Sequence, residues 1–205
     1  ETSGNIRLRE LDVANLVADR VTGDFSYDGK GLKIPSLAIG AYGGKIQLND
    51  LQLSPDLESW RLGLQYSPID LETLMGAFGI EGRKAPGGVL RGRLDLEGEG
   101  LNPEKLRGKG HVRIDRGRLY NIPVLLSVFS VLDLTIPRHS PVSDAYGTFR
   151  VGDGRLTIKD LLLSGGDIPV HLEGHVAMEK NTKLPDQPLK LLVTVPASPN
   201  VLDSV

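Results

Sequence analysis

The sequence predicts a mainly β fold, a curved antiparallel meander of about a dozen short strands with two short helices. Apolar and polar residues alternate along most of the 205 residues, which is typical of strands with one buried and one solvated face. The 25 glycines and 13 prolines separate these segments without a regular period, so they indicate turns. Long crossover helices, which parallel strands require, are missing from the pattern. Many short strands joined by short turns therefore favour the antiparallel arrangement.

Five segments show the alternation most clearly, and each is expected to be a strand. Their apolar residues are Phe25 and Tyr27; Leu62, Leu64 and Tyr66; Leu90, Leu94 and Leu96; Val112 and Ile114; Val170, Leu172 and Val176. We expect one domain over residues 1–205, a fragment of a longer chain. The stretch 80–87, which contains glycine and proline, can divide this domain into halves at 1–79 and 88–197.

A ten-residue repeat begins at three glycines. The copies are 4–13, 44–53 and 154–163. In each copy the apolar residues occupy every second position, and this alternation shifts by one position after an acidic residue, which is Glu10, Asp50 or Asp160. A change of parity turns later side chains to the opposite face of a strand. We therefore expect a bulge or bend at each acidic residue, and a curved sheet.

The first helix is predicted after Ser67, which suits an N-cap, with Pro68 at the first helical position and Gly79 as the stop signal. Its apolar residues have the spacing of one helix face: Leu71, Leu74, Met75 and Phe78.

The second helix is predicted in the most apolar stretch, with Asn121 as the cap and Pro123 in the first turn. The stretch from Ile122 to Ile136 has 15 residues, fewer than the roughly 20 that a membrane-spanning helix needs. Its polar residues form one narrow stripe: Ser127, Ser130 and Asp133. This helix either caps the curled sheet or is an ordinary buried core helix.

Composition excludes several classes of function. The net charge is −2, with Lys and Arg interspersed among Asp and Glu, so no nucleic-acid partner is expected. Because the chain has no cysteine, disulfides, thiol nucleophiles and cysteine-based zinc sites are excluded. No Gly-x-Ser-x-Gly motif occurs, and we predict that the chain is not an enzyme and needs no cofactor. A glycosidase-type pair of carboxylates stays open, because its two acids need to be close only in space.

Two stretches resemble metal sites without meeting their geometry. His171 and His175 lie in an alternating segment, where a strand would place them ~13 Å apart, too far to share one ion. Residues 24–29 imitate the first half of an EF-hand loop, but Pro35 stands where the bidentate Glu belongs. Residues 40–46 lack the spacing of a phosphate-binding loop. We expect a strand in the first case, turns in the other two, and no metal site.

Several blocks, taken in order, resemble the C-terminal region of AsmA-like proteins, a bacterial envelope family related to bridge-like lipid carriers built from repeating β-grooves. The blocks are "YGGKIQLNDLQLS", "DLETLMGAFG", "GGVLRGRLDLEGEG", "LRGKGHVRIDRGRLYNIPVLLSVFSVL" and "FRVGDGRLTIKDLLLSGG". The resemblance implies a non-catalytic periplasmic protein that binds or conducts phospholipid between membranes in outer-membrane biogenesis. The family's N-terminal membrane anchor is absent from this sequence, so we expect a tether to the inner membrane outside it.

Two short helices cannot cover a sheet that is ~50 Å wide at ~4.8 Å per strand. A sandwich, a closed barrel and a curled, taco-like sheet with an open groove remain as solutions, and we favour the groove. Its expected lining is Ile46, Leu48, Leu94, Leu96, Val112, Ile114, Leu156, Ile158, Val170 and Leu172. The capping helix would contribute Val124, Leu125, Val128, Phe129, Val131 and Leu132. The alternative function is a structural or protein-interaction β module with a sealed core.

Overall fold

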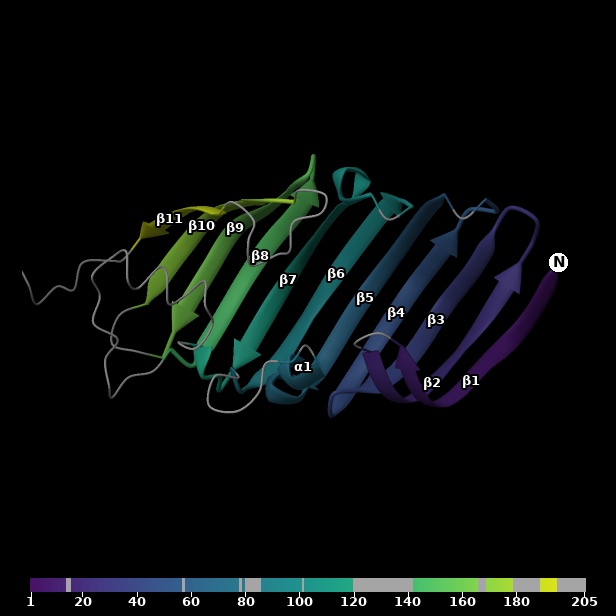
Figure 1. Ribbon diagram of the computed structural model, residues 1–205, viewed down its shortest axis with the longest axis horizontal. Coiled ribbons are helices and arrows are strands. Elements are labelled where there is room, and N and C mark those ends of the chain that lie inside the picture. Colours follow the sequence, from purple (N-terminus) through teal and green to yellow (C-terminus); the bar gives the residue numbers. More distant parts are fainter. Residues whose placement is uncertain are drawn as a thin grey trace, which may run out of the picture.

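The computed structural model describes residues 1–13, 16–56, 58–77, 79, 86–100, 102–119, 142–165, 169–178 and 189–194. In this part of the chain, eleven strands form one antiparallel sheet whose strand order follows the chain order (Figure 1). The strands are β1 (Thr2–Val13), β2 (Leu16–Tyr27), β3 (Leu32–Ala41), β4 (Gly44–Leu53), β5 (Ser59–Asp70), β6 (Val89–Glu99), β7 (Arg107–Asp115), β8 (Asp144–Gly152), β9 (Arg155–Ser164), β10 (Val170–Ala177) and β11 (Leu189–Thr194). The predicted mainly β antiparallel meander is confirmed, with eleven strands rather than about a dozen.

The described helices are one α-helix, α1 (Leu71–Ala77), and one 3₁₀ turn, η2 (Pro103–Lys105). The second predicted helix lies in residues 121–136, outside the described part of the chain. Strands β5 and β6, which flank residues 80–87, pair directly with each other, so the sheet runs on from one predicted half to the other.

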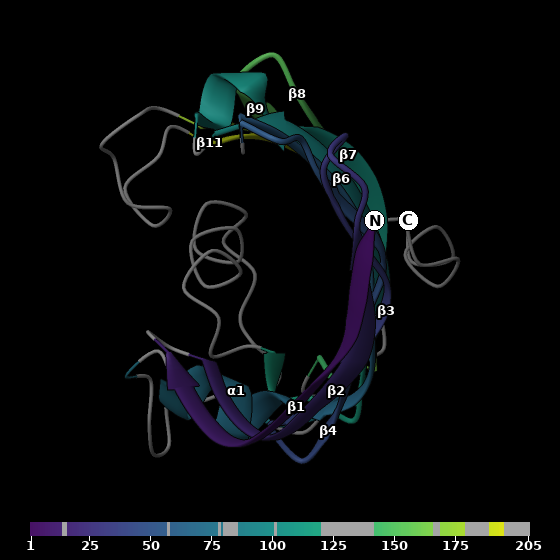
Figure 2. The same cartoon turned by 90° about the vertical axis from the view of Figure 1, so that its right-hand side faces the viewer.

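The sheet is curved, and Figure 2 shows it as an arc with α1 on its concave side. The predicted bends coincide with local irregularities. Glu10 and Asp50 have φ values of 56° and 51°, in the left-handed region, and the register between β4 and β5 shifts at Asp50. In β9 the pairing with β8 moves from Asp160 to Ile158, which leaves Lys159 as an extra residue. The register shifts at Asp50 and beside Asp160 are β-bulge positions and confirm the bends expected there. At Glu10 the register between β1 and β2 continues without a shift, and the positive φ alone marks an irregularity.

The start of the first helix was predicted incorrectly. Ser67 and Pro68 belong to β5, at a point where the register between β5 and β6 shifts, and a bulge tolerates proline because no ladder hydrogen bond is required there. The N-cap is Asp70, whose Oδ1 accepts hydrogen bonds from the backbone N (2.7 Å) and Oγ1 (2.8 Å) of Thr73. Gly79, with φ 77°, follows the helix as predicted.

The turn predicted in residues 40–46 is present. Tyr42 and Gly43, with φ values of 52° and 68°, connect β3 to β4, as the paired positive values of a type I′ hairpin turn require. The other predicted turn, in residues 24–29, is wrong for residues 24–27, which belong to β2. The chain turns only after them, where the Asp28 carboxylate accepts a hydrogen bond from the backbone N of Lys30 (3.0 Å).

Two buried clusters lie at the α1 end of the strands. One contains Leu71, Leu119, Ala145, Leu163, Val170 and Leu172. The other contains Ala18, Val21, Ile39, Ala41, Tyr42 and Ile69. Leu74 of α1 packs against both clusters, so the helix holds two stretches of the sheet together. Arg118 and Glu72 form an ion pair (2.9 Å) that joins the helix to the segment after β7.

We expect Asp50→Val to lower the free energy of unfolding by about 1–2 kcal/mol, because a β-branched side chain is strained at a positive φ. Asp50→Gly should change it little, since glycine adopts this backbone conformation freely. Urea unfolding followed by circular dichroism measures both. The matched control is Asn49→Val, at the preceding residue, which lacks a positive φ. A control as destabilised as Asp50→Val would contradict this explanation.

Candidate functional site: the apolar face

One face of the sheet carries apolar side chains from β1 to β10. Residues directly opposite each other in antiparallel strands point to the same face, so Cα partners can be followed across the sheet. One such row is Ile6, Gly23, Leu37, Leu48, Leu64, Leu94, Gly110, Phe149, Ile158 and Gly174. The next is Leu8, Val21, Ile39, Ile46, Tyr66, Gly92, Val112, Gly147, Leu161 and Leu172. Every position is aliphatic, aromatic or glycine, and we call this surface the apolar face.

The opposite surface, the polar face, has the reverse character. A row of Cα partners on it is Asn5, Asp24, Ser36, Asn49, Gly63, Asp95, Lys109, Arg150 and Thr157. Leu74 of α1 packs against the buried cluster that contains Val21 and Ile39 of the apolar face. Because α1 lies on the concave side in Figure 2, the apolar face is the concave one.

All ten residues predicted to line a groove lie on the apolar face. Leu96 and Leu156 belong to a third row, and Ile114 and Val170 to a fourth. Val170 and Leu172, exposed by 5% and 0%, are sealed in the cluster with Leu71. The other eight are half-buried. The six residues of the predicted capping helix, Val124, Leu125, Val128, Phe129, Val131 and Leu132, lie outside the described residues.

The sequence prediction missed members of the same rows. Leu37, Leu64 and Phe149 lie beside predicted residues on the apolar face, and their alternation could have identified them. The glycines gave no such signal. A Cβ added at Gly110 would lie 2.6 Å from Leu94 Cδ2 and 2.8 Å from Phe149 Cζ, so the neighbouring side chains cover the glycine. Glycine thus lets larger apolar groups from adjacent strands spread over the sheet.

Tyr66 is the polar group within these rows. Burial raises the pKa of its hydroxyl above the ordinary value, because the charged phenolate would lose its hydration. The neighbours of Tyr66 therefore partly shield its hydroxyl from water.

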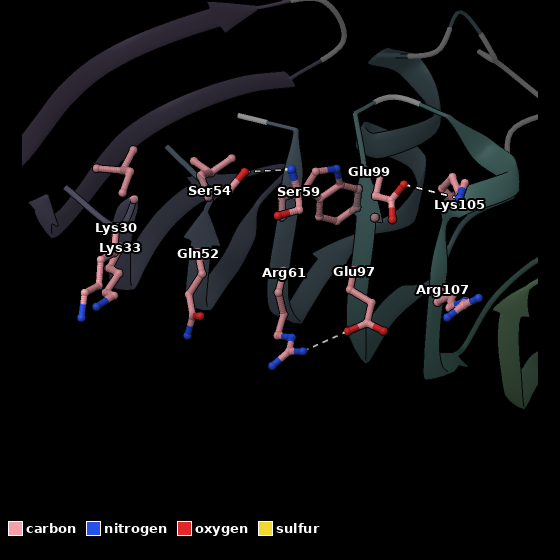
Figure 3. A pocket seen from close by; sticks show the side chains of 15 residues that line it. Lys30, Lys33, Gln52, Ser54, Ser59, Arg61, Glu97, Glu99, Lys105 and Arg107 are labelled. Carbon is pink, nitrogen blue, oxygen red and sulfur yellow. Dashed lines mark hydrogen bonds and ion pairs between the residues drawn. The ribbon is translucent and has the colours of Figure 1, made fainter. Parts of the chain in front are cut away.

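A hollow of about 460 Å³ lies at the rim of the sheet farthest from α1 (Figure 3). Five of its residues form one row of Cα partners on the polar face: Lys33, Gln52, Arg61, Glu97 and Arg107. Ion pairs join Arg61 to Glu97 (3.2 Å) and Lys105 to Glu99 (3.5 Å). Five residues that line the hollow are basic and two are acidic, so its walls carry a net positive charge, and these charged walls do not suit hydrocarbon.

On the polar face, Asp115 bridges two arginines. Arg91 and Arg113 are Cα partners, so their like charges are opposite each other. The Asp115 carboxylate accepts hydrogen bonds from Arg113 Nε (2.6 Å) and Arg91 Nη1 (2.5 Å). The bond from Arg113 is the main reason why the pKa of Asp115 lies below its ordinary value. The negative charge of Asp115 thus offsets the repulsion between Arg91 and Arg113, which face each other across two strands.

The strand predicted around His171 and His175 is confirmed, because both residues lie in β10. His171 lies near Asp160 (3.8 Å) on the polar face. No group of three or more metal-binding side chains occurs within the described ranges. In the same ranges, no helix combines the length and hydropathy needed to cross a bilayer.

Comparisons of this chain with protein-family models, with curated protein sequences and with solved structures give no match.

Replacing Asp115 with Asn should reduce stability at neutral pH and have little effect in acid. Because the pKa of the folded carboxyl is lowered, its contribution is present above the unfolded value of about 3.9 and is lost as the pH falls below it. Urea midpoints of both proteins at pH 7 and pH 2.5 measure the difference. Asp12→Asn, at an exposed carboxylate, is the control. A gap between wild type and variant that is the same at both pH values would disprove the ionic explanation.

Proposed function

We propose that this chain is a non-catalytic envelope protein of the AsmA-like type, whose apolar face forms an open groove that binds or conducts phospholipid acyl chains between membranes. The observation that carries the proposal is the pair of uninterrupted apolar rows from β1 to β10. Most of the predicted lining residues in these rows are half-buried, and within the described part of the chain they are not sealed as Leu172 is. Such extended, half-covered apolar surface is characteristic of binding grooves.

Hydrocarbon is the ligand that suits this surface. Each acyl CH₂ group that leaves water contributes ~0.8 kcal/mol, and the aliphatic rows need no polar contact with the lipid. Because neighbouring rows are chemically alike along the sheet, one position of a chain is nearly as favourable as the next. Acyl chains can therefore slide along the groove, with low selectivity between lipids.

A protein that holds lipid on one face needs a water-compatible surface on the other, and the polar face provides it. Its charged and hydroxyl side chains keep the convex surface solvated while the concave surface holds lipid. We place the protein in the periplasm, tethered to the inner membrane by a segment outside this sequence, with a role in outer-membrane biogenesis. This localisation rests on the resemblance to AsmA-like proteins.

Photo-crosslinking distinguishes an open groove from a sealed core. A diazirine amino acid at Leu48 or Leu94, both half-buried on the apolar face, should label bound phospholipid strongly. Two controls are built into the structure. Arg93 precedes Leu94 but points to the polar face, and Leu172 shares the apolar face but is 0% exposed. Labelling at Leu48 and Leu94 no stronger than at Arg93 would reject the groove.

A charge placed on the apolar face should also displace lipid. Leu94→Glu is expected to reduce phospholipid that copurifies with the protein at least about fivefold, since a buried carboxylate is strongly disfavoured beside hydrocarbon. Arg93→Glu, the adjacent change on the polar face, should leave the lipid content unchanged. Native mass spectrometry measures both, after circular dichroism has confirmed that each variant is folded. A wild-type protein free of lipid would instead favour the structural β module.

A further inference from the structure

Several aromatic rings on the apolar face lie over glycines of the neighbouring strand. A Cβ added at each of these glycines would come too close to the ring, so the ring occupies the space in which a side chain would stand. In every case the aromatic residue and the glycine are Cα partners. The pairs are Phe25 with Gly4, Trp60 with Gly98, Tyr66 with Gly92, and Phe149 with Gly110.

Trp60 is held in this position from two sides. Its ring atoms Cζ2, Cε2 and Nε1 lie 2.8, 3.0 and 3.3 Å from the place where a Cβ of Gly98 would be. Its Nε1 also donates a hydrogen bond to the backbone carbonyl of Gly100 (2.8 Å). The indole therefore lies across β6 at the rim of the sheet farthest from α1.

The placement of the rings affects the depth of the concave side. Side chains that project from a concave surface converge, and the apolar face is the concave one (Figure 2). A ring that lies over a glycine extends along the sheet, and only about one atomic layer of ~3.5 Å separates its outer surface from the backbone below. A ring displaced from the glycine would extend toward the concave side and fill part of its volume.

We propose that Gly92, Gly98 and Gly110 are positioning residues for lipid binding. Each allows an aromatic ring to lie across the neighbouring strand and so keeps the groove deep enough for an acyl chain. The inference rests on the proposed function, because it takes hydrocarbon as the occupant above the rings. Rings over glycines also stabilise sheets by covering exposed backbone, so the test compares lipid content among folded variants.

Gly98 is the best position for the test. The three atoms nearest to its added Cβ all belong to the Trp60 ring, whereas at Gly92 and Gly110 the nearest atom is a backbone oxygen of the adjacent strand. Gly98→Ala thus displaces the ring with little direct effect on the backbone. Gly152→Ala in β8 is the matched control, because nothing lies within 4 Å of the Cβ that it adds.

We expect Gly98→Ala to reduce the phospholipid that copurifies with the protein at least about threefold, and Gly152→Ala to leave it unchanged. Adding Trp60→Leu to Gly98→Ala should restore the wild-type lipid content, because the displaced ring is then gone. Native mass spectrometry measures the lipid after circular dichroism has confirmed folding. Trp60 is the single tryptophan of the chain, so phospholipid with brominated acyl chains should quench the tryptophan fluorescence of the wild type.

An unchanged lipid content in Gly98→Ala, or a loss that Trp60→Leu does not restore, would overturn the inference and leave the proposed function standing. A wild-type protein that binds no lipid would reject the proposed function itself. If Gly98→Ala does not fold, Gly4→Ala with and without Phe25→Leu gives the same comparison. The three atoms nearest to a Cβ at Gly4 all belong to the Phe25 ring.

Discussion

The whole structure depends on the cross-strand register that keeps the apolar residues of strands β1 to β10 on one face. The side-chain period of a strand is two residues, so a slip by one residue would move a strand's apolar set to the polar face. Leu48, Leu64 and Leu94, which come from three consecutive strands, are successive Cα partners. The turns fix this register locally, as the paired positive φ values at Tyr42 and Gly43 illustrate.

The bends reconcile that register with a curved sheet. A regular strand that stayed in register through Asp50 would point Leu51 away from the face that carries Leu48, because the two differ by an odd number of residues. The irregularity at Asp50 restores the orientation, and the corresponding shift at Asp160 does so in β9. An acidic residue suits this place because Asp and Asn tolerate the left-handed region better than other non-glycine residues. The same residues therefore set both the curvature and the continuity of the apolar face.

The strands and bends were predictable because their signals are local. Alternation identifies a strand and its faces, and the change of parity identifies the bend at Asp50. The start of α1 was not predictable from Ser67 and Pro68, because a distant hydrogen bond from the Asp70 backbone N to the Tyr42 carbonyl (2.9 Å) extends the strand past them. Likewise, alternation places Leu172 on the apolar face but does not reveal that Leu71 and Leu119 seal it. The residues that bury an apolar side chain can come from segments remote in sequence, and the periodicity of one segment does not reveal them.

Because strand order equals chain order, each strand contacts chiefly its immediate neighbours in sequence. The folding free energy of such an array is close to the sum of contributions from the single strands and from the contacts between neighbouring strands, as in solenoid proteins. Most connections between successive strands are short, although those from Asp70 to Val89 and from Asp115 to Asp144 are longer, so assembly can start at any of the tight hairpins and proceed outward in both directions. The molecule should consequently lose order by fraying from its ends, with the two ends melting independently and the segment clamped by α1 melting last.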